Sequence, residues 1–155
     1  MGRTTESEKI RKEFLENFEV SVKRNGYGFI GPIAPHKEIY LIAKPNSLFA
    51  VFVKVSAIKE KFWGLNEKLQ NDFREIFDKK KDPGSVQERI VILLDGAKRG
   101  YFLTGDKFDE LSKSLYSDKN GDYKILEKDL NTMGTWFLGI DDLLNRMGLQ
   151  EETVS

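Results

Sequence analysis

The sequence predicts a single α/β (α+β) domain in which a mixed β-sheet is flanked by helices. Segments with apolar residues at helical spacing alternate along the chain with short segments rich in β-branched and aromatic residues. A length of 155 residues fits one domain, which we place at residues 1–150 with a loose polar tail at 151–155. The hydrophobic fraction of 39% is enough to fill one core, so we expect a folded chain rather than a disordered one.

Composition narrows the classes of function. The chain contains no cysteine, which removes disulfides, thiolate catalysis and cysteine-based zinc sites together. It contains no apolar run of the roughly 20 residues that span a membrane, and residues 1–6 form no signal core. We therefore expect a cytoplasmic protein without a membrane partner. A charged fraction of 32%, rich in Lys and Glu, is compatible with a thermophilic source.

The charges are distributed unevenly between the two halves of the chain. Residues 1–81 contain 16 Lys and Arg and 11 Asp and Glu, whereas residues 82–155 contain 9 and 14. Such a chain could present a basic face to a polyanion although its net charge is zero. Alternatively, folding mixes the halves and removes the asymmetry, because linear charge does not determine surface charge. Both interpretations stay open from the sequence alone.

The N-terminal segment predicts a helix and then a short strand. Thr5 and Glu8 match a capping box, and apolar residues recur at helical spacing over residues 6–18. Alternation over residues 20–22 predicts a first strand. The glycines and prolines of residues 26–35 indicate turns.

A hairpin and a second helix follow. Two segments rich in β-branched and aromatic residues, 38–43 and 48–57, predict antiparallel strands joined by a turn at 44–47. Phe62-Trp63-Gly64 indicates a break between regular elements, and helical spacing over 66–80 then predicts a helix.

The second half alternates strands and helices again. Its predicted strands are residues 89–94, 101–104 and 123–126, and its predicted helices are residues 106–116 and 140–147. This element order implies a mixed sheet covered by helices.

In the hairpin and the elements around it, the sequence resembles the PD-(D/E)XK nuclease superfamily. In those enzymes an acidic residue begins one strand, and an acid-x-lysine pair ends or follows the next. Glu38 stands in the place of the first acid and Lys54 in the place of the lysine, with helices before and after the hairpin. The resemblance covers about residues 5–105, and it implies a restriction-endonuclease-like fold that binds DNA or RNA.

The chemistry of that superfamily is metal-dependent hydrolysis of a phosphodiester. Mg²⁺ polarises the phosphate and prefers carboxylate oxygens as ligands. The resemblance therefore implies Glu38 as a metal ligand and Lys54 beside the attacked phosphate. Phe52, however, occupies the place of the second acid. In this superfamily a following helix sometimes supplies the missing acid, and Glu67 is the nearest candidate there.

Lysines and aromatic residues interleave directly after the hairpin, a combination that can grip phosphates and stack on bases. The candidate nucleic-acid-binding residues are Lys54, Lys59, Lys61, Trp63 and Lys68. Phe62 is more typical of a core residue, whereas a stacking role and a core role are equally open for Trp63.

Two further motifs predict surface turns rather than sites. Asp118, Asn120 and Asp122 match the first three ligand positions of a calcium loop. Tyr123 occupies the position that requires glycine, so we expect a polar turn. His36 has no cysteine partners and cannot form a structural zinc site.

Three functions remain open from the sequence. The first is a nucleic-acid-binding protein with a nuclease-like fold whose hydrolytic site is degenerate because Phe52 replaces an acid. The second is an active Mg²⁺-dependent nuclease, with Mg²⁺ as the cofactor that it would require. The third is a protein-interaction subunit, for example a homodimer, in which Glu38 and Lys54 are ordinary polar residues at strand ends.

Overall fold

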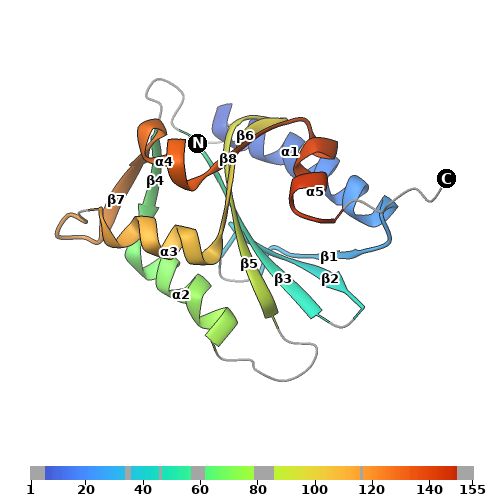
Figure 1. Cartoon of the computed structure of the whole chain (residues 1–155), viewed down its shortest axis with the longest axis horizontal. Coiled ribbons are helices and arrows are strands. Elements are labelled where there is room, and N and C mark those ends of the chain that lie inside the picture. Colours follow the sequence, from blue (N-terminus) through green and yellow to red (C-terminus); the bar gives the residue numbers. More distant parts are fainter. Residues whose placement is uncertain are drawn as a thin grey trace, which may run out of the picture.

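The computed structural model of the chain describes residues 6–33, 36–45, 47–56, 62–78, 86–115 and 117–149. Its elements in chain order are α1 (Glu6–Arg24), β1 (Gly28–Ile30), β2 (Ile39–Lys44), β3 (Ser47–Val55), β4 (Phe62–Asn66), α2 (Glu67–Asp78), β5 (Val86–Gly96), β6 (Arg99–Thr104), α3 (Gly105–Lys113), β7 (Asp122–Leu126), η1 (Glu127–Asp129), α4 (Leu130–Met133), β8 (Thr135–Leu138) and α5 (Ile140–Arg146). Figure 1 shows their arrangement. The capping residue Thr5 and the tail at 151–155 lie outside the described residues.

β3 and β5 are the central pair of a six-stranded sheet with the order β1-β2-β3-β5-β6-β8. Among the described strands they form the one parallel pair, since all the other neighbours in this sheet run antiparallel. A parallel pair needs a crossover connection, and here β4 and α2 lie within it. β4 does not join the large sheet but pairs antiparallel with β7. The crossover therefore places a second, two-stranded sheet beside the first.

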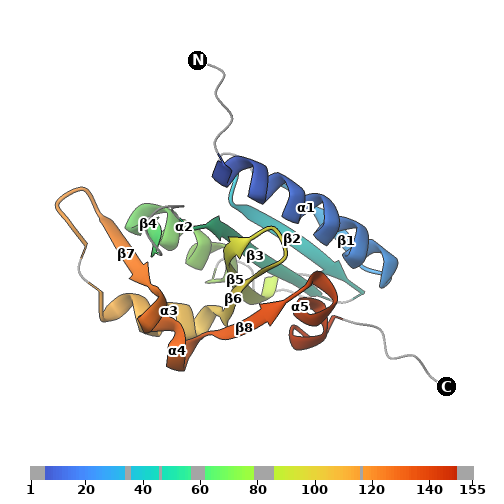
Figure 2. The same cartoon turned by 90° about the horizontal axis from the view of Figure 1, so that it is seen from above.

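Two separate hydrophobic clusters cover the two faces of the large sheet. Successive side chains on a strand point to opposite faces, so Val51 and Val53 enter one cluster while Ala50 and Phe52 enter the other. The first cluster includes residues of α1 and α5, and the second includes residues of α2, α3, β4 and β7. Figure 2 shows these elements on opposite sides of the sheet. The predicted mixed sheet flanked by helices is confirmed.

The predicted hairpin is confirmed as β2 and β3. Their antiparallel register places Ile39 opposite Phe52 and Lys44 opposite Ser47. As a result, the start of β2 lies beside the end of β3. Glu38 and Lys54, which are 16 positions apart in the sequence, therefore lie at the same end of the sheet.

Helix α1 is longer than the sequence pattern predicts, and the strand predicted at residues 20–22 is wrong. Phe14, Phe18 and Val22 are buried at helical spacing, whereas the side chain of Val20 is 56% exposed. In a strand, Val20 and Val22 would point to the same face. The continuing apolar stripe packs against the sheet and extends the helix to Arg24.

Three strands are absent from the sequence-based prediction. β1 lies in the stretch that was predicted as turns, and β8 lies between two glycines near the C-terminal helix. β4 occupies the segment that was predicted as a break. It alternates buried Trp63 and Leu65 with partly exposed neighbours, which is a strand pattern that Gly64 conceals.

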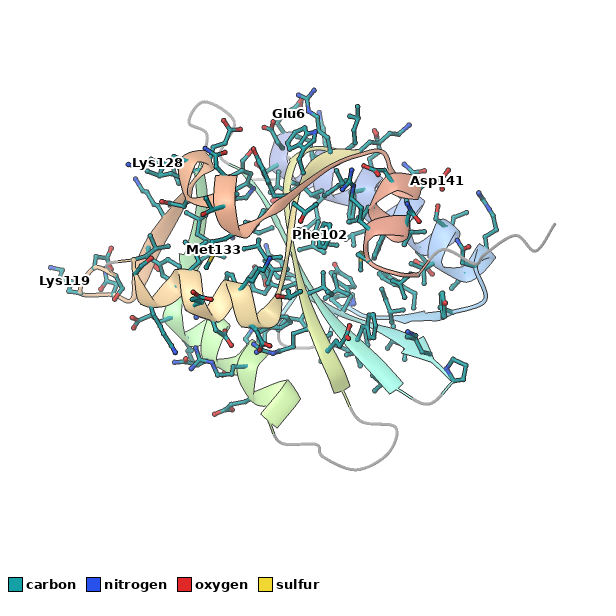
Figure 3. All side chains as sticks on the ribbon, in the orientation of Figure 1. Glu6, Phe102, Lys119, Lys128, Met133 and Asp141 are labelled. Carbon is teal, nitrogen blue, oxygen red and sulfur yellow. The ribbon has the colours of Figure 1, made fainter. Side chains whose placement is uncertain are left out.

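Many of the charged side chains lie on the outside of the molecule. In Figure 3, Glu6, Lys119 and Asp141 project at the periphery, whereas Phe102 lies over the centre of the ribbon. Within the described residues, no helix combines the length and the apolar character needed to cross a membrane.

A buried ion pair attaches α3 to β5. The side chain of Arg89 on β5 is 5% exposed, and its Nη2 and Nη1 donate to the carboxylate of Asp109 over 2.7 and 3.4 Å. Gly105 leaves space for this arginine, since a Cβ at that position would lie 2.7 Å from the Arg89 Cβ. The guanidinium carbon also lies 5.6 Å from the ring centroid of Phe73 on α2. One side chain thus contacts both helices on this face.

We expect Asp109→Ala to lower the free energy of unfolding by about 3 kcal/mol, because it removes the carboxylate that the buried guanidinium of Arg89 contacts at 2.7 Å. Urea denaturation measures the change. Asp106→Ala is the control, because the Asp106 carboxylate is fully exposed and 3.9 Å from Arg89, so its loss should change stability much less. Equal effects of the two substitutions would contradict this assignment.

Candidate functional site

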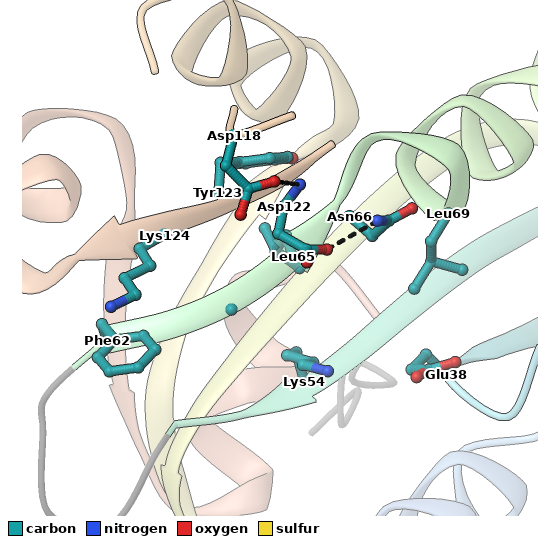
Figure 4. Close-up of a pocket in the computed structure, with 11 residues that line it drawn as sticks. Glu38, Lys54, Phe62, Leu65, Asn66, Leu69, Asp118, Asp122, Tyr123 and Lys124 are labelled. Carbon is teal, nitrogen blue, oxygen red and sulfur yellow. Dashed lines mark hydrogen bonds between the residues drawn. The ribbon is translucent and has the colours of Figure 1, made fainter. Parts of the chain in front are cut away.

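A pocket of about 380 Å³ opens beside the end of β3. Its walls come from segments far apart in the sequence: the residue before β2, the end of β3, one side of β4, the first turns of α2, and β7 with the turn before it. Figure 4 shows the side chains that line it. Those with polar groups are Glu38, Lys54, Asn66, Asp118, Asp122, Tyr123 and Lys124.

The structure brings Glu38 and Lys54 into this one pocket, as the family resemblance implies. The hairpin register fixes their positions, and the backbone N–H of Val53 donates to the carbonyl of Glu38 over 2.9 Å. Within the described part of the chain, neither side chain forms an ion pair or a hydrogen bond. No carboxylate of the described residues therefore neutralises the ammonium of Lys54 by direct contact.

Asp118 and Asp122 lie in the same pocket, which sequence reasoning did not anticipate. The expected polar turn is present: Oδ1 of Asp118 accepts the backbone N–H groups of Asn120 and Asp122 over 2.8 and 3.1 Å. Oδ1 of Asp122 accepts Nδ2 of Asn66 over 2.8 Å. The spacing indicates the turn, but only the pairing of β4 with β7 places that turn next to Lys54.

Tyr123 also lines the pocket and stays protonated at neutral pH. Its hydroxyl donates to Oε1 of Gln70 over 2.7 Å and lies 3.3 Å from the hydroxyl of Ser112. Burial raises the pKa of Tyr123 to about 12. The phenol therefore links β7 to α2 and α3 and does not act as a base.

Trp63 is a core residue, and the stacking role considered for it is wrong. Its side chain is 1% exposed, and Nε1 donates to the carbonyl of Leu94 over 3.0 Å. The ring also meets Tyr101 edge to face, with centroids 6.1 Å apart. Trp63 thus attaches β4 to the end of β5 and leaves no ring face free for a base. The candidates Lys59 and Lys61 lie outside the described residues.

No family model matches the chain, and no curated protein matches it in sequence. Among solved structures, the chain is similar to a Holliday junction resolvase from the archaeal hyperthermophile Archaeoglobus fulgidus. The TM-score is 0.57 at 14% sequence identity, and the match covers 92% of this chain and 98% of the resolvase. The chain has a restriction-endonuclease-like fold. At this identity, the likeness establishes the fold alone.

The position that the resemblance assigns to the second acid is part of the core. Phe52 lies on the same face of β3 as Lys54, two residues earlier, and is 1% exposed. Its ring centroid is 5.6 Å from that of Phe73 on α2 and 6.2 Å from that of Phe108 on α3. Residues of both α2 and α3 therefore pack over the position that the resemblance assigns to a metal-binding carboxylate.

Glu67 does not replace the missing acid. It lies with Lys68 in a neighbouring cavity of about 490 Å³ and is absent from the residues that line the pocket of Glu38 and Lys54. Its Oε1 accepts the hydroxyl of Ser117 over 2.8 Å. Across the described ranges, no group of three or more His, Asp or Glu side chains could hold a metal ion. The residues present thus do not fit the Mg²⁺ site that the resemblance implies.

We expect Phe52→Glu to unfold the protein or to cost more than about 3 kcal/mol, because it buries a carboxylate among aromatic rings. It should not create Mg²⁺-dependent cleavage. Urea denaturation and incubation with labelled DNA and RNA test the two expectations. Phe52→Leu is the control, since it stays apolar and loses only part of the ring volume. A folded Phe52→Glu protein with Mg²⁺-dependent cleavage would show that the helices do not seal this position.

Proposed function

We propose that this chain is a nucleic-acid-binding module that retains a nuclease-like fold and does not hydrolyse its ligand. The observation that carries the proposal is the contrast between two residues on one face of β3. Phe52 is sealed under α2 and α3, whereas Lys54 lines an open pocket. On this proposal, the position at which the resemblance expects a metal-binding acid lies in the core, and Lys54 is accessible to a phosphate.

The charge of Lys54 supports a phosphate-binding role. Lys54 lies near the end of β3, and no described carboxylate neutralises its ammonium by direct contact. A lysine in such a position is available for a phosphate oxygen, and binding releases the counterions of the nucleic acid. Lys68, in the adjoining cavity, and Lys124, within the same pocket, extend the set of cations.

Lys54→Ala should weaken the binding of labelled DNA or RNA and make log K less dependent on log salt, by about 0.7 to 0.9 for each lost phosphate contact. Fluorescence anisotropy at several salt concentrations, with and without Mg²⁺, measures both quantities. Lys107→Ala, on the exposed side of α3 and lining none of the pockets described above, is the charge-matched control.

The oligonucleotides recovered from the same titrations should remain intact with Mg²⁺ present. Cleavage that Glu38→Ala abolishes would instead establish an active nuclease and refute the proposal. A protein that binds none of the four ligand types, single- or double-stranded DNA or RNA, at low salt would refute it as well.

A second candidate, a protein-interaction subunit, is favoured by the surface of β8. This strand lies at one end of the described sheet, where its neighbour is β6. Its Trp136 and Leu138 side chains are 40% and 66% exposed. Exposed apolar residues on an edge strand are typical of surfaces that pair with another chain.

If β8 pairs with a second copy of the chain, the sedimentation coefficient should rise with protein concentration, and Leu138→Lys should prevent that rise. Leu126→Lys is a control of the same type on β7, where the residue is 39% exposed. A sedimentation coefficient that is constant and monomeric at all concentrations would exclude the dimer.

A further inference from the structure

The pocket of Glu38 and Lys54 carries charges of both signs. Its carboxylates are those of Glu38, Asp118 and Asp122, and its ammonium groups are those of Lys54 and Lys124. A surface that follows a phosphate backbone is lined by cations, because every phosphate must be matched. Three carboxylates in this small space would repel a continuous backbone. They favour a ligand that brings its own hydrogen-bond donors together with a single anionic group.

An aromatic ring forms one end of the same pocket. Phe62 is partly exposed at the start of β4, and the Nζ of Lys124 lies 4.5 Å from its ring centroid. An ammonium over a ring is a weak interaction at an exposed site. A nucleobase can take its place, since any base offers a flat face for stacking. Lys124 would then be released for a phosphate.

Gly64 leaves a gap on the strand between Phe62 and Asn66. These three residues share one side of β4, and all three line the pocket. A Cβ on Gly64 would have Phe62 Cε1 at 3.8 Å as its nearest atom, which is an ordinary contact. Gly64 is not among the glycines with positive φ, so its backbone accepts other residues. A glycine in a strand interior weakens the strand, and it often marks a bulge, a tight bend, or the close approach of a ligand or of another backbone. Because Gly64 lines the pocket, the approach of a ligand fits this position.

We infer that this pocket binds one unpaired nucleotide, with the base against Phe62 above Gly64 and the phosphate between Lys54 and Lys124. The inference rests on the proposed nucleic-acid binding and deepens it by naming a single-stranded ligand. Amino and ring N–H groups of the base face the carboxylates of Asp118 and Asp122, which are acceptors. A base inside a duplex is stacked on both faces, so it has no free face for Phe62, and its ring N–H is engaged in pairing.

The test compares one labelled 12-residue DNA strand in three forms by fluorescence anisotropy at low salt. The forms are the single strand, its blunt duplex, and a single strand with abasic sites that retains the phosphates. The wild-type protein should bind the single strand at least about tenfold more tightly than the other two, which is the scale of stacking one base on an aromatic ring.

Two variants locate the effect in the pocket. Gly64→Val fills the space above the ring, and Phe62→Leu keeps apolar bulk without a ring. Each should lower affinity for the single strand by about tenfold and leave affinity for the duplex and the abasic strand unchanged. Lys119→Ala, an exposed lysine in the adjoining cavity, is the control that should not alter the preference. Thermal unfolding verifies that each variant is folded.

The outcomes separate this inference from the function on which it rests. Salt-sensitive binding that is equal for single strand and duplex, or unaffected by Gly64→Val and Phe62→Leu, would overturn the unpaired-nucleotide pocket and leave nucleic-acid binding intact. An absence of binding to all three DNA forms and to the matching RNA at low salt would overturn both.

Discussion

The parallel pairing of β3 with β5 is the constraint on which the rest of the structure depends. Both strands are buried on both faces, so their side chains divide between two hydrophobic clusters. Parallel neighbours cannot be joined by a tight turn, and the chain must leave the sheet and return. β4 and α2 form this crossover connection, and they pack on the face of the sheet that carries Phe52. The pocket exists because β4 passes the end of β3 on this path.

Because of the same packing, two residues close together on β3 have different surroundings. Phe52 and Lys54 share a face, but α2 and α3 cover the first, and the second lies at the open end of the strand. At position 52, next to the pocket, an aromatic side chain packs between rings of the covering helices, where a polar side chain would not. Contact with Phe73 and Phe108 stabilises the domain through burial of apolar surface. A carboxylate there would have to be paired or solvated, but the side chain at this position is 1% exposed and contacts aromatic rings.

The pocket also decides between the two interpretations of the charge asymmetry in the sequence. Glu38 and Lys54 come from the basic half of the chain, whereas Asp118, Asp122 and Lys124 come from the acidic half. β4 belongs to the first half and β7 to the second, and their antiparallel pairing joins the two at this point. At the pocket, folding mixes the halves. The pocket therefore presents both positive and negative side chains. This combination suits a ligand that carries hydrogen-bond donors and one anionic group better than it suits a polyanion.

Local patterns in the sequence determined much of the fold: most of the helices, the β2–β3 hairpin, the β5 and β6 strands, and the placement of Glu38 and Lys54 at one end of the sheet. These features follow from periodicity and turn chemistry, which act over a few residues. Only the tertiary structure decided that residues 20–22 continue a helix, that Phe62-Trp63-Gly64 is a strand, and that Trp63 is buried. It alone placed the Asp118–Asp122 turn beside Lys54 and Glu67 in another cavity. Those outcomes depend on contacts between segments far apart in the sequence, such as Trp63 with Leu94, 31 positions away, and β4 with β7. Short-range patterns carry no information about such contacts.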